Sequence, residues 1–99
     1  MVIERRIFER YPCNVLASCI DSNNASLGVK CYDLSARGVG VASLEYLPVE
    51  TRLRLNLCTK TKTPLAVEGI VRWCSKTPEE WRAGVEFSKR LSFPLVMVV

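Results

Sequence analysis

The chain has 99 residues, of which 48% are hydrophobic, a formal net charge of +4 and no histidine. This length allows one domain with one hydrophobic core. The net charge suits an anionic ligand but is lower than expected of a dedicated DNA-binding protein. A nucleophile activated by histidine is excluded, and no other pattern places a base beside a nucleophile. We therefore expect a protein without enzymatic activity.

Five cysteines, Cys13, Cys19, Cys31, Cys58 and Cys74, occur without a CxxC pair. An odd number without such a pair argues against a disulfide framework or a zinc ribbon. All but Cys74 lie in apolar strand-like runs, where a thiol behaves as a small hydrophobic side chain, so we expect no metal site. No apolar run is long enough to span a bilayer, and the N-terminus lacks a signal-peptide core, which predicts a cytoplasmic protein.

Residues 1–11 are charged and poor in β-branched residues, and we expect them to form an arm. Alternating hydrophobicity and turn residues then predict six strands, at residues 13–20, 27–33, 38–43, 51–58, 65–75 and 81–87. Segment 44–50 contains Pro48 and is expected to be a connection. Short strands at this spacing, with no helical period, are typical of a sandwich or a small barrel.

Within these strands, Gly69 suggests a bend or bulge in the middle of residues 65–75. The alternation also predicts that Trp73 and Trp81 point inward as core aromatics, like most aromatic residues of the chain.

Residues 88–99 form an apolar tail, in which Pro94 and several β-branched residues disfavour a helix. A free apolar end would be an exposed patch. We expect residues 91–99 to be buried on the open side of the barrel or against another subunit, which predicts a homo-oligomer. The alternative is a frayed end.

The turn between the second and third predicted strands has the sequence Asp33-Leu34-Ser35-Ala36-Arg37-Gly38. The short side chains of Asp33 and Ser35 can hydrogen-bond to backbone or ligand. Gly38 allows a positive φ or a close approach to another group. Taken alone, this pattern indicates only a polar hairpin connection.

Arginines in the arm change that interpretation. Arg6 and Arg10 stand four residues apart, and a guanidinium presents a planar fork to phosphate oxygens or to the guanine edge. The carboxylate of Asp33 can accept hydrogen bonds from the opposite guanine edge. These parts suit a guanine nucleotide.

Three motifs in order, Arg5-Arg6-x-x-x-Arg10, Asp33-x-Ser35-x-x-Gly38 and Gly84-Val85-Glu86-Phe87, resemble the RxxxR, D/NxSxxG and GVxF elements of the PilZ domain family. The run Val71-Arg72-Trp73 also resembles that family. The similarity covers residues 5–87. It implies a six-stranded antiparallel PilZ-like barrel that binds the bacterial second messenger cyclic di-GMP, made of an arm (1–11), a barrel (12–87) and a tail (88–99). Family members usually add a C-terminal helix, which residues 88–99 do not predict.

For the arm, the resemblance implies that Arg6 and Arg10 contact guanine and phosphate. It also implies that Arg5 helps to decide whether one cyclic di-GMP or an intercalated pair is held. An arm that is flexible when empty is expected to fold over the ligand.

For the turn, the resemblance implies that Asp33 and Ser35 contact a guanine edge and its attached phosphate or sugar, while Gly38 permits the close turn. Arg37 is an additional candidate, and the alternative for it is a solvated side chain.

The leading hypothesis is therefore a cyclic di-GMP receptor that needs no other cofactor and signals through its arm to a protein partner. One alternative is an interaction domain of the same fold that binds no nucleotide. Another is a small barrel for single-stranded nucleic acid, which would require exposed aromatics on a basic groove.

Overall fold

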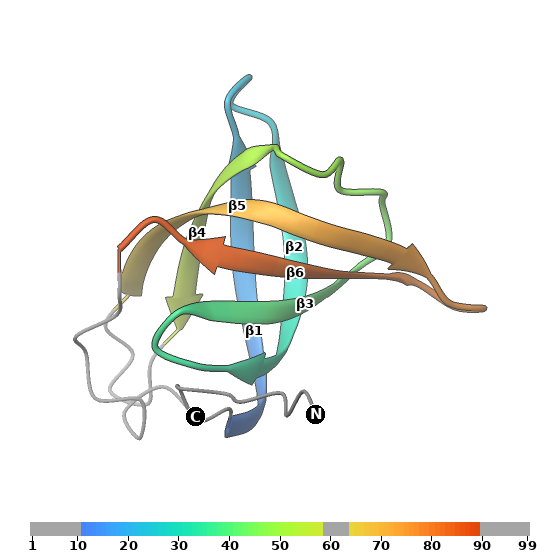
Figure 1. The fold of residues 1–99 in the computed structure, drawn as a ribbon, viewed down its shortest axis with the longest axis horizontal. Coiled ribbons are helices and arrows are strands. Elements are labelled where there is room, and N and C mark those ends of the chain that lie inside the picture. Colours follow the sequence, from blue (N-terminus) through green and yellow to red (C-terminus); the bar gives the residue numbers. More distant parts are fainter. Residues whose placement is uncertain (1–10, 59–63, 90–99) are drawn as a thin grey trace, which may run out of the picture.

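The computed structural model describes residues 11–58 and 64–89, which form six strands and no helix. The strands are β1 (Tyr11–Asp21), β2 (Ser26–Leu34), β3 (Gly38–Ser43), β4 (Arg52–Cys58), β5 (Pro64–Lys76) and β6 (Trp81–Phe87). All neighbours pair antiparallel in the order β1-β2-β3-β6-β5-β4, and β4 pairs back onto β1 (Figure 1). The predicted six-stranded antiparallel barrel is confirmed, and β3 and β6 have the predicted bounds.

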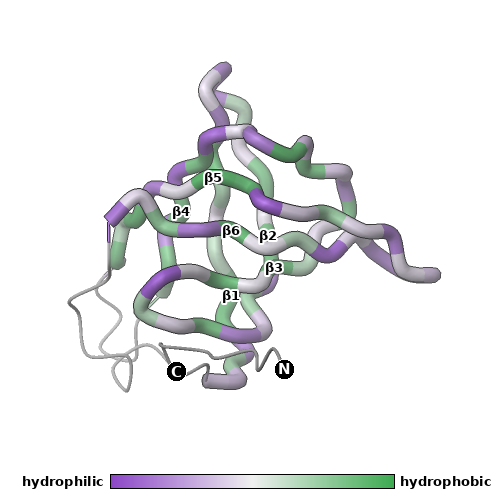
Figure 2. Tube along the Cα trace, viewed as in Figure 1, coloured by the Kyte–Doolittle hydropathy of each residue, from purple (hydrophilic) through white to green (hydrophobic). Residues whose placement is uncertain are grey.

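The barrel interior is filled by the side chains on one face of each strand. In β4, Leu53, Leu55 and Leu57 are buried while Arg52 and Arg54 are exposed. Figure 2 shows hydrophobic and hydrophilic residues mixed along the strands, as expected when one face is buried and the other is wet. The connection between β3 and β4 contributes one buried leucine, Leu47, to this core. The buried residues of this core include Leu34, Val39, Val41, Leu47, Leu55, Leu57 and Val71.

Three register shifts interrupt the ladder. They lie in β1 between Pro12 and Val15, in β2 between Cys31 and Asp33, and in β5 between Val71 and Trp73. A bulge adds one residue on one strand and turns the following side chains to the other face. Val71 is fully buried, whereas Trp73 is 45% exposed. The prediction that Trp73 belongs to the core is therefore wrong.

Gly69 itself pairs regularly with both neighbouring strands. A methyl group at Gly69 would lie 2.6 Å from the carbonyl oxygen of Glu86, so close strand contact accounts for this glycine. The predicted bulge exists, but three residues later, at Arg72.

The aromatic residues are mostly outside the core. Among the described aromatics, only Phe87 is buried. Trp81 is half-buried and packs against Tyr46 with ring centroids 5.0 Å apart. The prediction that most aromatics point inward is wrong, and with it the main argument against single-stranded nucleic acid.

The five cysteines form no disulfide with one another. Cys19 and Cys31 are buried, and burial raises the pKa of Cys19 to about 11 and that of Cys31 to about 12. These two behave as the expected small hydrophobic residues, whereas Cys58 is exposed. The described residues contain no group of three or more potential metal ligands, and none of their segments is a helix able to cross a membrane.

Arg5, Arg6 and Arg10 lie outside the described residues, as do residues 91–99. Their assigned roles in ligand binding and self-association stay predictions.

Candidate functional site

The connection between β2 and β3 is held by the side chain of Ser35. Its Oγ accepts hydrogen bonds from the backbone N–H groups of Arg37 and Gly38, both at 3.2 Å. The Ser35 N–H also donates to the carbonyl of Gly38 at 2.9 Å. Ser35 is only 4% exposed, so its hydroxyl fixes the turn.

Asp33 and Gly38 fix the two sides of the same turn. The Asp33 carboxylate accepts a hydrogen bond from the Gly40 N–H at 2.9 Å across the β2 bulge. Gly38 does not have a positive φ. A methyl group there would lie 2.5 Å from the carbonyl oxygen of Val85 on β6. Close approach of two strands, rather than an unusual backbone conformation, therefore requires this glycine.

The strand register places four residues in one row across the outside of the barrel. Asp33 on β2 pairs with Gly40 on β3, Gly40 pairs with Gly84 on β6, and Gly84 pairs with Trp73 on β5. Neighbouring strands lie about 4.8 Å apart, so the row spans roughly 14 Å. It runs from a carboxylate over two glycines to an indole.

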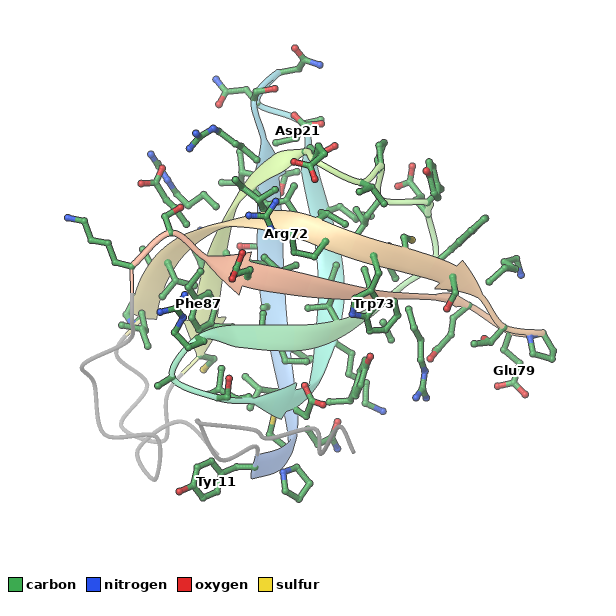
Figure 3. The ribbon with its side chains drawn as sticks, viewed as in Figure 1. Tyr11, Asp21, Arg72, Trp73, Glu79 and Phe87 are labelled. Atoms are coloured by element: carbon green, nitrogen blue, oxygen red, sulfur yellow. The ribbon has the colours of Figure 1, made fainter. Side chains whose placement is uncertain are left out.

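Aromatic rings cover both glycines of this row. Figure 3 shows the side chain of Trp73 beside β6. It lies against Gly84 so closely that a methyl group there would collide with its indole Nε1. The ring of Tyr32 covers Gly40 in the same way and carries the Arg82 guanidinium 4.7 Å above its centroid. Glycine at these two positions therefore leaves the space that the aromatic rings occupy.

A pocket of about 250 Å³ opens beside the row. Its wall joins the turn to β5 and β6, and it includes three charged side chains, Arg37, Arg72 and Glu86. The Arg72 Nε donates to Glu86 at 2.8 Å, and Arg37 lies 3.8 Å from the same carboxylate. The hydrogen bond and charge of Arg72 hold the pKa of Glu86 below its ordinary value. The pocket thus combines an aromatic face with two guanidinium groups.

Comparisons with known proteins identify the family of the chain. The family model described as PilZ domain matches residues 4–95. The chain belongs to the PilZ domain family. No curated protein matches the sequence significantly.

Solved PilZ structures share the fold at low identity. The motility inhibitor MotI/DgrA of Bacillus subtilis superimposes with a TM-score of 0.75 at 20% identity, over 91% of this chain and 46% of that one. The c-di-GMP complex of the YcgR PilZ domain from Escherichia coli gives 0.72 at 16% identity, over 95% and 84%. YcgR in complex with c-di-GMP gives 0.70 at 20%, over 96% and 42%. This PilZ domain therefore spans less than half the length of the MotI and YcgR chains.

Several of the predicted site residues lie at or beside this pocket. The structure brings Ser35, Arg37 and Gly38 to the same pocket, and Asp33 to the adjoining row. Trp73 was assigned to the core, and Gly84 entered only as part of a motif. The sequence does contain a signal for the exposed position of Trp73, namely the consecutive residues Arg72 and Trp73. Consecutive side chains of a regular strand point to opposite faces, so both can reach solvent only if the strand has a bulge.

Proposed function

We propose that this PilZ domain is a non-enzymatic receptor for cyclic di-GMP. The observation that carries the proposal is the placement of the Asp33–Gly38 turn beside an exposed tryptophan and two arginines in one pocket. Two of the structural neighbours are complexes with c-di-GMP. A ligand with two guanines and two phosphate charges requires both an aromatic face and guanidinium donors.

Each described residue has a matching chemical role. Trp73 offers an indole face on which a guanine stacks, a contact worth about 1–3 kcal/mol per base. Arg37 and Arg72 donate to phosphate. Ser35 supports the turn, and Asp33 sets the position of Gly40 while keeping a carboxylate at the end of the row, where guanine N–H groups can donate to it.

The size of the pocket supports a need for further contacts with the ligand. Its volume of about 250 Å³ is below the roughly 300–1,000 Å³ usual for a small-molecule site. It therefore takes only part of a cyclic dinucleotide. We infer that Arg6 and Arg10 of the N-terminal arm provide the remaining contacts, and that ordering of the arm on binding signals to a protein partner.

The number of ligands depends on Arg5 in this proposal. Two stacked molecules concentrate four phosphate charges, and Arg5, Arg6 and Arg10 would place three guanidinium groups around them. Calorimetry of the parent should give about two ligands per chain, and Arg5→Leu about one. A parent that binds one ligand regardless of residue 5 would contradict this part of the proposal alone.

Calorimetric titration with cyclic di-GMP, GTP and a short oligonucleotide tests the proposal. We expect binding of cyclic di-GMP only. Arg6→Ala and Arg10→Ala should each weaken it by about ten-fold or more, since a charged hydrogen bond contributes roughly 1.5–3 kcal/mol. Arg54→Ala, an exposed arginine on β4 away from the pocket, is the matched control and should bind like the parent.

The other outcomes decide between the alternatives. Oligonucleotide binding without cyclic di-GMP binding would favour a single-strand binder, and binding of neither would favour an interaction domain. Equal affinities for Arg6→Ala, Arg10→Ala and Arg54→Ala would remove the arm from the site.

A further inference from the structure

Arg72 joins the candidate site to a loop outside it. Its guanidinium donates through Nε to Glu86 on β6 at 2.8 Å, and through Nη1 to both carboxylate oxygens of Glu50 at 3.3 Å. Glu86 and Arg72 line the candidate pocket, whereas Glu50 does not. Arg72 therefore has one carboxylate partner in the pocket wall, Glu86, and a second partner outside the pocket, Glu50.

This network is weakly held and can be rearranged. The side chains of Arg72, Glu86 and Glu50 are 46%, 41% and 68% exposed. Exposed ion pairs contribute little to stability because water screens them. Arg37 approaches the same Glu86 carboxylate at 3.8 Å, so two carboxylates balance two guanidinium groups. A phosphate that enters the pocket meets guanidinium groups whose present partners are easily exchanged.

Glu50 is the second-last residue of the connection between β3 and β4, and its backbone conformation is uncommon. Its φ is +73°, which is uncommon for a residue other than glycine. The Glu50 N–H donates to the Val71 carbonyl at 2.8 Å, and the Val71 N–H donates to the Thr51 carbonyl at 3.0 Å. The end of the loop is thus fastened to β5 directly beside the bulge that carries Arg72.

The loop attached in this way presents an apolar surface. Leu44 is 84% exposed, Tyr46 51% and Val49 45%, while Leu47 between them is buried in the barrel end. A change at Glu50 therefore acts on a segment with three exposed apolar side chains and one anchor. Exposed apolar side chains of this kind often mark a protein interaction site, so a partner protein could respond to a shift of the loop.

We propose that Arg72 is a relay between the ligand site and the loop of residues 44–51. In the empty domain the Arg72 guanidinium donates to the Glu50 carboxylate. A ligand phosphate replaces Glu50 as the acceptor for Arg72. Glu50, whose φ is +73°, then loses this contact, and the loop shifts. The inference rests on the proposed function, because it requires an anionic ligand in the pocket.

The decisive variant is Glu50→Gln, which removes the carboxylate that competes with the ligand without altering the pocket wall. Glu45→Gln is the matched control, with the same chemical change in the same loop and no bond to Arg72. We expect Glu50→Gln to bind cyclic di-GMP about two- to five-fold more tightly, the range that exposed ion pairs support, and Glu45→Gln to bind like the parent.

Backbone amide NMR spectra give the second readout. In the parent and in Glu45→Gln, cyclic di-GMP should shift the amides of residues 49–51 and of Tyr46. In Glu50→Gln these amides should already lie near their ligand-bound positions before ligand is added. Ligand binding that leaves the loop amides unmoved, or identical behaviour of the two variants, would overturn the relay alone. A parent that does not bind cyclic di-GMP would overturn the proposed function and the relay with it.

Discussion

The contact between Trp73 and Gly84 provides a test of the site that does not require a ligand. A methyl group at position 84 has no room while the indole lies over it. Overpacking of this kind costs typically about 1–3 kcal/mol. When Trp73 is replaced by alanine, the three atoms nearest to that methyl group are gone, and alanine should be favoured over glycine in a strand by roughly 0.5–1 kcal/mol.

The expected result is a strong non-additivity. Trp73→Ala alone should cost about 2–3 kcal/mol, since a large aromatic buries 150–250 Å², about half of that area is buried here, and buried apolar area contributes about 25 cal/mol per Å². Gly84→Ala should destabilise the parent and stabilise the Trp73→Ala background. The coupling energy should therefore be about 2 kcal/mol, well above the additivity error of 0.3–0.5 kcal/mol.

Urea unfolding of the four proteins of this cycle measures the coupling. Gly28→Ala on β2 is the control glycine, because no atom lies within 4 Å of a methyl group at that position. Gly28→Ala should change the free energy of unfolding by the same amount in the parent and in the Trp73→Ala background. If Gly84→Ala has the same effect in both backgrounds, Trp73 does not lie on Gly84 and the aromatic face of the site is misplaced.

Three further results are expected. Asp33→Ala should weaken cyclic di-GMP binding more than Arg37→Ala in calorimetry, because it also removes the acceptor for a β3 backbone N–H, and equal losses would contradict this. Leu55→Ala should lower the free energy of unfolding by about 2–5 kcal/mol, since Leu55 is fully buried, and a loss below 1 kcal/mol would contradict its central place. At pH 8 a thiol-reactive dye should modify Cys58 in the folded protein but not Cys31, because a pKa of about 12 leaves only about one thiolate in ten thousand.

Strand positions could be predicted from the sequence because they depend on local patterns. The three buried leucines of β4 alternate with polar residues, so the pattern itself distinguishes the inner from the outer face. Turn residues then mark the ends of the strands. For β3 and β6 this was sufficient to give the observed bounds.

The row from Asp33 to Trp73 could not be predicted in this way, because it depends on register between strands that are distant in sequence. Gly40 and Gly84 are partners only because β3 pairs with β6. A shift of one residue in that pairing would exchange the inner and outer faces. The contact between Glu50 and Arg72 could not be predicted either, since it joins the connection between β3 and β4 to β5, 22 residues further along the chain.

The β5 bulge has a physical cause that links the core to the site. Regular alternation after Val71 would direct Trp73 into the barrel, close to Ala83, which is itself 1% exposed. A close-packed interior of this size has no space for an indole there. With one extra residue at Arg72, the smaller Cys74 pairs with Ala83 and packs against the core instead. Arg72 and Trp73 then both stand on the outer face. The register shift that relieves the core thus places an aromatic face and a guanidinium group beside the Asp33–Gly38 turn.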